Sequence, residues 1–154
     1  EAVAREAIEM LRARVRERDA RIVFETSLPR CRADRIRLRE IYANLISNGI
    51  KYNDKAEVRI ELGHREAGDS ARPGPVYYVR DNGIGIATAM SGRAFQSFKR
   101  RPDAEKFGEG SGVGLAVVKK LVGQHGGAVW FESEPGRGTT MYITLADAEG
   151  LSND

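Results

Sequence analysis

The stretch that decides the fold is Asn44-Leu-Ile-Ser-Asn48-Gly-Ile-Lys51. It places two carboxamides and a cation at intervals of four and three residues, which is one face of a helix. Two further segments follow along the chain, Asp81-Asn-Gly83-Ile-Gly85 and Gly108-Glu-Gly110-Ser-Gly112-Val-Gly114-Leu115. The second offers a carboxylate beside two glycines, and the third runs from a glycine-rich loop into a helix. Each segment alone is a weak signal, and the order of the three makes the pattern informative.

The composition is that of an ordinary globular domain. The 154 residues are enough for one domain with a buried core, and 41% of them are hydrophobic and 31% charged. The 25 basic and 22 acidic side chains leave a net charge of +3, which is too balanced to indicate a nucleic-acid partner. Cys31 is the only cysteine, so no disulfide can form within the chain.

The chain shows no sign of a membrane span or a signal peptide. No hydrophobic run approaches the ~20 residues that cross a bilayer, and the N-terminus alternates charged and apolar residues. The chain begins without Met inside a helical pattern. We therefore expect a fragment of a longer protein, with a cytoplasmic location and with any sensor or membrane anchor lying upstream.

The hydrophobic pattern predicts an α+β fold, with one sheet of four to five strands covered on one face by three helices. The helices are expected at residues 1–18, 35–52 and 113–125. The strands are expected at residues 21–27, 58–66, 76–80, 128–133 and 139–145. Asp34 is expected to cap the second helix, and the turn at 134–138 to make the last two strands a hairpin. Residues 84–109 have a mixed character with a short helix expected near 90–98, and a loop of this length is usually functional or disordered.

The polar stripe of the second helix is suited to a metal and phosphate. Glu40, Asn44, Asn48 and Lys51 recur every three or four residues. A carboxamide oxygen is a suitable ligand for Mg²⁺, which also keeps waters and phosphate oxygens, and Lys51 can meet phosphate as a point charge. For an isolated Asn-x-x-x-Asn, a solvated helix face is the more probable interpretation.

The other two segments complete a nucleotide site. A buried carboxylate at Asp81 could accept the exocyclic amine of adenine, although Asp-Asn-Gly alone is more often a turn. Glycines that lead into a helix place backbone N–H groups against phosphate, and their position next to a helix argues against a flexible linker. The P-loop pattern is absent, and the dinucleotide-binding pattern fails because Leu115 stands where its third glycine is required. Together the three segments predict a Mg²⁺–ATP site.

With a fourth segment, Phe95-Gln-Ser-Phe98-Lys99, these motifs resemble, in chain order, the N, G1, F and G2 boxes of bacterial sensor histidine kinases. The resemblance extends from about residue 20 to residue 146, and residues 37–54 look most like kinases of the phytochrome-like group. It implies the Bergerat fold, an α/β sandwich with a mixed, mostly antiparallel sheet. It also implies that ATP and Mg²⁺ are the cofactors.

The resemblance implies a role for each matching residue. Asn48 would coordinate Mg²⁺, with Asn44 beside it and Lys51 on the phosphates. Tyr52 would pack on adenine, Asp81 would accept its amine, and Gly83 and Gly85 would give the base room. The remaining expected nucleotide-binding positions line the phosphates or belong to a lid between Ile86 and Gly108, which is expected to be mobile without nucleotide. They are Ile86, Phe95, Phe98, Gly108, Gly110, Ser111, Gly112, Val113, Gly114 and Leu115.

The chain departs from the family pattern in two respects that bear on function. Gly49 stands where the family usually has Ala, which we expect to loosen the helix by up to about 1 kcal/mol. Neither His64 nor His125 lies in a phosphoacceptor motif, and both are interpreted as structural or exposed. The expected partners are therefore a dimerisation/phosphoacceptor domain outside this chain and a downstream response regulator.

The expected organisation is an N-terminal helix at 1–18 that continues from the dimerisation domain, an ATP-binding domain at 19–148 and a polar tail at 149–154. The longer protein would be a homodimer and this fragment a monomer. Two alternatives stay open: an ATPase or conformational clamp of the same fold, and a pseudokinase that binds nucleotide without transferring phosphate. The first is disfavoured because related ATPases carry a glutamate at the position of Asn44, and Glu40 lies one helical turn further away.

Overall fold

The computed structural model describes residues 1–66, 74–86 and 114–145. Four helices are described: α1 (Ala2–Met10), α2 (Arg12–Glu17), α3 (Arg35–Lys51) and α4 (Gly114–Gln124). Five strands are described: β1 (Arg21–Phe24), β2 (Arg59–Arg65), β3 (Val76–Asp81), β4 (Val129–Glu134) and β5 (Gly138–Ile143). Every strand lies inside its predicted range or within one residue of it.

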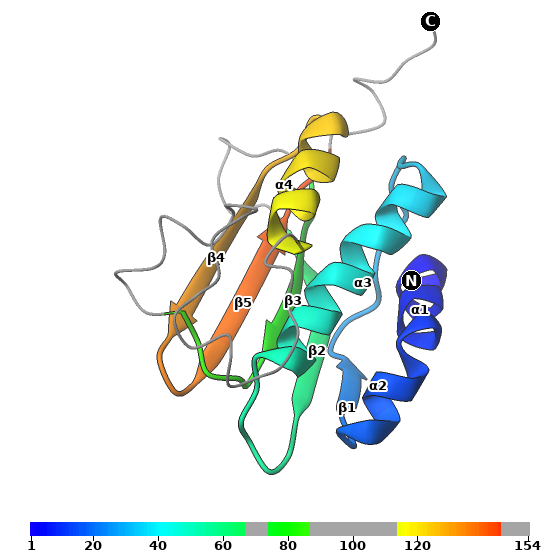
Figure 1. Cartoon of the computed structure of the whole chain (residues 1–154). Coiled ribbons are helices and arrows are strands. Elements are labelled where there is room, and N and C mark those ends of the chain that lie inside the picture. The colour runs from blue at the N-terminus through cyan, green and yellow to red at the C-terminus, as the bar shows by residue number, and fades with distance from the viewer. Residues whose placement is uncertain (67–73, 87–113, 146–154) are drawn as a thin grey trace, which may run out of the picture.

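The strands form one mixed sheet in the order β1-β2-β3-β5-β4. β1 runs parallel to β2, and the other neighbouring pairs are antiparallel. The described helices gather on one side of this sheet (Figure 1), which confirms the predicted α+β arrangement. The last two strands form the predicted hairpin, with Gly136 and Gly138 at positive φ in its turn.

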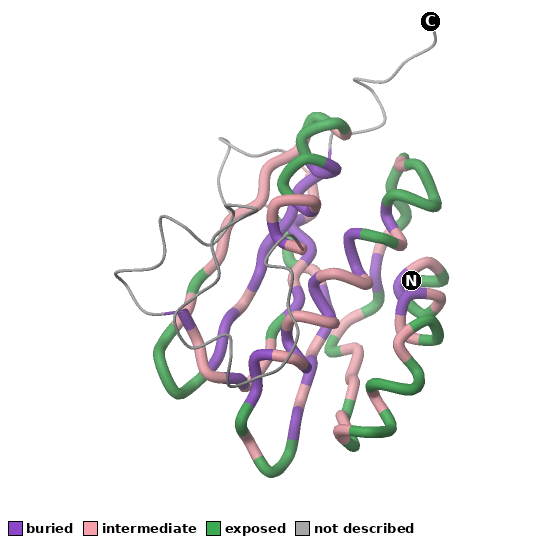
Figure 2. The backbone as a smooth tube through the Cα atoms, in the orientation of Figure 1, coloured by how far each residue is buried: buried purple, intermediate pink, exposed green. Residues whose placement is uncertain are grey.

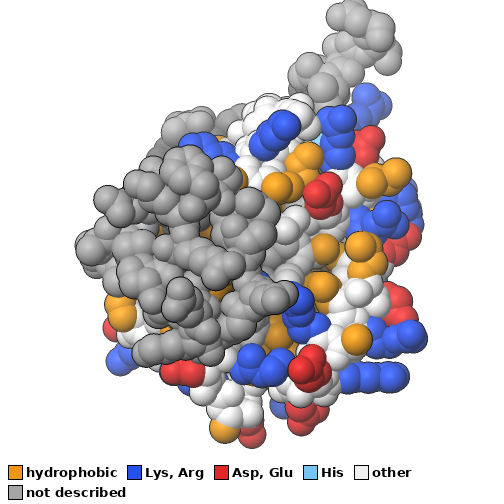
Figure 3. All heavy atoms as spheres, in the orientation of Figure 1, with side chains coloured by type: hydrophobic (Ala, Val, Ile, Leu, Met, Phe, Trp, Pro, Cys, Tyr) orange, Lys and Arg blue, Asp and Glu red, His pale blue; other side chains and the backbone are white. Residues whose placement is uncertain are grey.

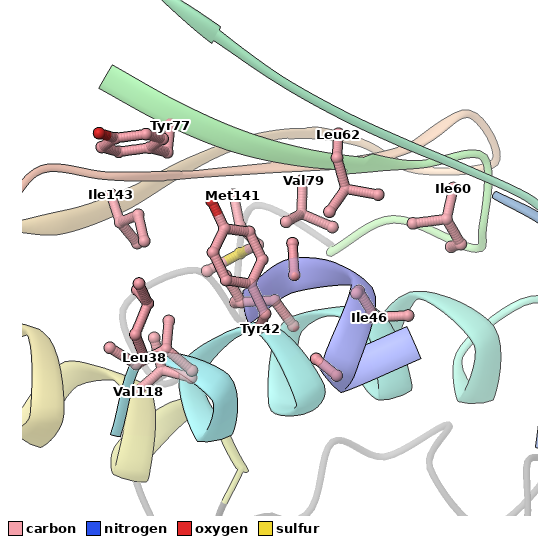
Figure 4. Close-up of a cluster of buried hydrophobic side chains, with 14 of the residues drawn as sticks. Leu38, Tyr42, Ile46, Ile60, Leu62, Tyr77, Val79, Val118, Met141 and Ile143 are labelled. Atoms are coloured by element: carbon pink, nitrogen blue, oxygen red, sulfur yellow. The ribbon is translucent and has the colours of Figure 1, made fainter. Parts of the chain in front are cut away.

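The core lies between the helices and this face of the sheet. Buried positions follow the sheet and the helix sides that face it (Figure 2). Side chains from α3 and α4 point towards the strands in Figure 4, where the labelled helix residues are Leu38, Tyr42, Ile46 and Val118. They meet a row of strand side chains at Ile60, Leu62, Tyr77, Val79, Met141 and Ile143. Hydrophobic side chains therefore recur at every second residue of β2, β3 and β5, because every second residue of a strand faces the helices.

The predicted helix over 1–18 is divided into α1 and α2 at Leu11, which has φ −99° and ψ 11°. The division lets two different contacts form with α3. Ala4 and Ala7 of α1 are fully buried in the core. Beyond the division, Arg14 reaches the hydroxyl of Ser47, and Arg18 reaches the end of α3.

The ends of α3 and α4 agree with the expected capping residues. The Asp34 carboxylate accepts a hydrogen bond from the backbone N–H of Arg37 at 2.9 Å, as predicted. The last turn of α4 is closed by Gly126, at φ 68°, and by the N–H of Gly127, which donates to the carbonyl of Val122 at 3.0 Å.

The opposite face of the sheet carries an aromatic cluster with arginine cover. The rings of Trp130 and Tyr142 stack with centroids 5.5 Å apart, and Tyr78 meets Tyr142 edge-on. The guanidinium of Arg65 lies 4.7 Å from the Tyr142 ring centroid. Tyr142 is consequently only 6% exposed, although the helices pack on the other face.

The visible helical surface carries separate small hydrophobic areas among Lys, Arg, Asp and Glu side chains (Figure 3). The longest described helix is α3, with 17 residues. No helix in the described ranges combines the length and apolar character needed to cross a membrane.

Candidate functional site

A pocket forms where the ends of α3 and β3 meet the start of α4 and the beginning of β5. Its walls come from three of the four segments that the sequence singled out, together with β5. The lining residues are Leu45, Asn48, Tyr52, Asp81, Ile84, Gly85, Ile86, Leu115, Thr139 and Met141. Segments that are far apart in the chain therefore meet at one place, as the motifs predicted.

Asp81 is the last residue of β3, and two backbone groups hold its carboxylate. The Oδ1 atom accepts hydrogen bonds from the N–H of Gly83 at 2.9 Å and from the N–H of Thr139 at 3.2 Å. Because both donors belong to the backbone, they fix the direction of the carboxylate without depending on side-chain rotamers. Thr139 was not among the predicted site residues, because nothing local marks a strand residue that pairs with Asp81.

The two glycines after Asp81 allow segments of chain to approach closely. A Cβ on Gly83 would lie 2.9 Å from Asp81 Oδ1 and would collide with the carbonyl oxygen of Tyr52. Gly85 has φ 75°, and a Cβ there would collide with the carbonyl of Glu134. These contacts explain why the loop requires glycine. Room for a base at the same positions stays a prediction.

The β4–β5 hairpin supports the loop from behind. The Ser133 hydroxyl accepts a hydrogen bond from the N–H of Ile86 at 2.6 Å. The carbonyl of Ile84 accepts one from the N–H of Gly136 at 2.7 Å. Two of the pocket residues, Ile84 and Ile86, are thereby held by the turn that the sequence identified only as a hairpin.

Asn44 and Asn48 both face the first residue of α4. A Cβ on Gly114 would lie 3.1 Å from Asn44 Oδ1 and 3.5 Å from Asn48 Nδ2. Asn44 donates from its Nδ2 to the carbonyl of Glu40 at 2.9 Å, so its oxygen is the atom turned towards α4. Two amides thus lie beside a helix N-terminus, where backbone N–H groups favour an anion.

Lys51 and Tyr52 end α3 next to this group. The Lys51 Nζ lies 5.8 Å from the Tyr52 ring centroid, and Tyr52 is 8% exposed. A cation in the last turn of a helix is also favoured by the helix dipole. The second half of α3 and its C-cap residue therefore supply the aromatic ring, the cation and both amides of the predicted site.

A hydrogen-bonded pair of asparagines, a buried Asn53 and a half-buried Asn82, connects the end of α3 to the end of β3. Asn53 is 1% exposed, and its Nδ2 donates to Asn82 Oδ1 at 2.8 Å. Asn82 in turn accepts from the N–H of Arg59 at 2.9 Å and donates to the carbonyl of Glu57 at 2.8 Å. Asn82 occurs in a quoted motif and Asn53 follows one closely, but no local pattern indicates that they pair with each other.

Part of the predicted site cannot be compared with the structure. The two aromatic positions, the expected helix at 90–98, the lid and most of the glycine-rich loop lie outside the described residues. The site residues concerned are Phe95, Phe98, Gly108, Gly110, Ser111, Gly112 and Val113. Gly114 and Leu115 are the described part of that loop, and Leu115 lines the pocket.

Residues 33–149 match the family of histidine kinase-, DNA gyrase B- and HSP90-like ATPases. The chain belongs to this family. Its similarity to histidine kinases of the phytochrome-like group, inferred from the motifs, is confirmed by the relatives. It is 44% identical over 140 residues to cyanobacterial phytochrome B of Nostoc sp. (strain PCC 7120), covering 91% of this chain and 18% of that protein. It is 40% identical over 145 residues to the methanogenesis regulatory histidine kinase FilI of Methanothrix harundinacea, covering 93% of this chain and 16% of that protein.

Solved structures of this family show the same fold. The mycobacterial sensor histidine kinase MprB superposes with a TM-score of 0.78 at 26% identity, covering 94% of this chain and 93% of that one. Full-length ShkA, solved in complex with AMPPNP, superposes with a TM-score of 0.73 at 30% identity, covering 96% of this chain and 30% of that one. The chain thus spans less than a fifth of the two curated relatives and corresponds to a histidine kinase ATPase domain.

Proposed function

We propose that this domain binds Mg²⁺–ATP in the pocket and donates the γ-phosphoryl group to a histidine on a dimerisation/phosphoacceptor domain outside the chain. The observation that carries the proposal is the shared pocket of Asp81, Tyr52 and Asn48 beside the N-terminus of α4. A hydrogen-bond acceptor for the base, Asp81, and a helix N-terminus suited to phosphate are thereby next to each other.

The adenine half of the proposal depends on Asp81. Its Oδ1 is held by Gly83 and Thr139, so the carboxylate is oriented before a ligand arrives. The pocket walls beside it include Leu45 and Met141, which suit the flat, apolar faces of a purine. A carboxylate that accepts from the adenine amine would then select adenine over bases that lack this donor.

The phosphate half depends on Asn44, Asn48 and α4. In the described part of the chain, no three His, Cys, Asp or Glu side chains cluster as a metal site. An Asn oxygen still fits Mg²⁺, because this ion keeps water and phosphate oxygens and needs few protein ligands. Bound Mg²⁺ would neutralise phosphate charge, with Asn48 as its protein ligand. Asn44 and Lys51 would hold the phosphates in place.

The chain supplies position and charge rather than a nucleophile, which is what phosphoryl transfer requires. Neither histidine is placed to accept phosphate within this site. His64 Nδ1 lies 2.9 Å from the Thr26 hydroxyl, and the N–H of Asp34 donates to His125 Nε2 at 3.1 Å. Their interpretation as structural residues agrees with these bonds and leaves the accepting histidine on another domain.

The ATPase or clamp alternative requires a base that activates water. Glu40 has an exposed side chain, and its backbone carbonyl accepts a hydrogen bond from the side-chain amide of Asn44. The position one turn closer to the pocket is Asn44, which has no basic carboxylate. This arrangement favours transfer over hydrolysis.

The proposal also covers the longer protein and the division of this chain. The accepting domain would belong to the same longer protein, a cytoplasmic homodimer that passes phosphate to a response regulator. The segment 1–18 would connect to that domain, 19–148 would be the ATP-binding unit and 149–154 a polar tail. This chain alone would be a monomer.

The adenine assignment is tested with Asp81→Asn. The variant keeps an oxygen for the two backbone donors but replaces the other carboxylate oxygen with an NH₂ group, which cannot accept from the adenine amine. Calorimetric titration with ADP and Mg²⁺ should show affinity reduced by at least about tenfold, which corresponds to ~1.4 kcal/mol. The exposed Asp54→Asn is the matched control and should bind like wild type. Equal affinities in Asp81→Asn and wild type would remove Asp81 from adenine recognition.

The metal assignment is tested with Asn48→Ala, in a transfer assay with the dimerisation domain of the same longer protein. At saturating ATP and Mg²⁺ we expect transfer to fall by at least about tenfold, because a ligand that positions the phosphates is lost. Undiminished transfer would exclude Asn48 from the mechanism. Binding of ATP without any transfer by the wild-type domain would favour the pseudokinase alternative.

A further inference from the structure

A second cavity lies at the other end of α3, away from Asp81. Its volume is about 440 Å³. It is lined by residues of α1, of the segment 28–31 and of α3, by Tyr77 of β3, and by Leu145, which follows β5. The apolar side chains in its lining include Val3, Leu28, Leu38 and Leu145. This volume is in the range of cavities that hold small organic ligands.

One polar group in this lining lacks a protein partner. Tyr42 is 4% exposed, and its interactions within the described residues are with Tyr77 and Cys31, with no hydrogen bond to its hydroxyl. Burial raises the pKa of Tyr42, and the nearby Tyr77 and Cys31 raise it further, so the hydroxyl keeps its proton as a donor. Both neighbours line the same cavity, which places the Tyr42 hydroxyl at its wall.

The other two polar groups of this wall are already engaged. The Tyr77 hydroxyl donates to the carbonyl of Pro29 at 3.3 Å, and the side chains of Cys31 and Tyr77 are hydrogen-bonded to each other. Because the Tyr42 hydroxyl is not among the fully buried atoms that lack a partner, it is accessible from the cavity and can donate to a ligand there. Tyr42 is therefore the position at which a ligand acceptor would gain a hydrogen bond from the protein.

We propose that this cavity binds an uncharged, mainly apolar small molecule that presents one hydrogen-bond acceptor to the Tyr42 hydroxyl. The uncharged character follows from the lining, because its two charged side chains, those of Glu1 and Arg30, are exposed and the others are apolar or uncharged polar groups. A charged group inside would lose its hydration without a partner. The site is separate from the nucleotide pocket, so the proposal stands independently of nucleotide binding.

A matched pair of probes tests the acceptor. Acetophenone and ethylbenzene share an aromatic ring and similar size, but only acetophenone carries an acceptor. Titrations followed by methyl NMR shifts of Leu38 and Leu145 should give saturable binding of acetophenone that is about fivefold tighter than that of ethylbenzene. In Tyr42→Phe the two probes should bind equally. In Tyr78→Phe, altered on the opposite face of the sheet, the preference should stay.

Cys31 provides a second readout at the site itself, since it is the only cysteine in the chain. Saturating acetophenone should slow alkylation of this thiol by iodoacetamide at least about twofold, because the ligand covers one side of it. The reaction is run above pH 8, since burial raises the pKa of the Cys31 thiol.

Either readout can overturn the proposal. No saturable shift with either probe would show a cavity that holds only water. A preference for acetophenone that persists in Tyr42→Phe, or unchanged alkylation at saturation, would show that the acceptor does not meet Tyr42 in this cavity.

Discussion

Single glycines determine how closely the elements of the nucleotide pocket approach one another. Gly49 was expected to loosen α3, but the helix continues through it to Lys51 and the residue is buried. A Cβ at this position would lie 2.7 Å from Ile60 Cδ1 and 3.0 Å from the Cβ of Asp81. Gly49 thus lets α3 approach the strand end that carries Asp81, a benefit that sets off its poor helix propensity.

Gly83→Ala tests the need for a close approach at the loop that follows Asp81. The added methyl group would press on the Tyr52 carbonyl and on Asp81 Oδ1. We expect at least about tenfold weaker ADP binding and a free energy of unfolding lowered by ~1–3 kcal/mol, because overpacking moves backbone. Calorimetry and urea denaturation measure the two effects.

The control is Gly123→Ala in α4, where a Cβ would meet no atom within 4 Å. This change should raise the free energy of unfolding by up to ~1 kcal/mol through helix propensity and leave ADP binding unaltered. Wild-type binding by Gly83→Ala would show that the close approach to Tyr52 is not needed for the site.

At the scale of elements, an ion-pair network on the open face of the sheet links β2, β3 and the residue that follows β1. Glu61 Oε1 lies 2.6 Å from Arg59 Nε, and Glu61 Oε2 lies 3.1 Å from Arg80 Nη1. Arg80 Nη1 also lies 3.1 Å from Glu25 Oε1. The network joins β2 and β3 to Glu25, the residue after β1, at a face that the described helices leave uncovered.

This network predicts a pH dependence of stability. Burial alone would raise the pKa of Glu61, but the hydrogen bonds from Arg59 and Arg80 outweigh it and hold the pKa below its ordinary value of 4.5. A lowered pKa stabilises the folded state above the unfolded value, and this contribution disappears as the pH falls through the folded value.

Glu61→Gln should therefore lower the free energy of unfolding at pH 7 by on the order of 1 kcal/mol. The difference from wild type should shrink as the pH falls below about 4.5. Urea denaturation at a series of pH values measures it, with Glu57→Gln at an exposed position as control. A difference that is constant from pH 7 to pH 3 would show that the charge of Glu61 is not involved.

At the scale of the whole molecule, the N-terminal helices share the core of the ATP-binding unit. α1 buries Ala4 and Ala7 against α3. After α2, Arg18 donates to the carbonyls of Ile50 at 3.3 Å and Asn53 at 2.6 Å. The N-terminal segment thereby reaches the last turn of the helix that carries Tyr52. Its continuation into an upstream domain stays a prediction.

Arg18→Ala should consequently affect both stability and the site. We expect a loss of ~1–3 kcal/mol in the free energy of unfolding, because two carbonyls lose a charged donor, and weaker ADP binding by at least about threefold. Arg16→Ala, with an exposed side chain on the adjoining helix α2, is the control and should change neither quantity appreciably. If Arg18→Ala destabilises the fold but binds ADP like wild type, the bridge supports only the fold.

The helices, the strands, the Asp34 cap and the hairpin turn could be predicted because each depends on residues close in sequence. Periodicity and capping act over one or two helical turns. The motifs likewise identified Asn48, Asp81 and Leu115 as neighbours, since each segment carries its own chemical signature.

Contacts between distant segments were decided by the tertiary structure alone. These include the position of β5 between β3 and β4, the division of the first helix at Leu11 and the donation from Thr139 to Asp81. The pairing of Asn53 with Asn82 is of the same kind. Strand order and buried hydrogen bonds depend on which surfaces meet after collapse, and a local pattern of side chains carries no record of its partner across the sheet.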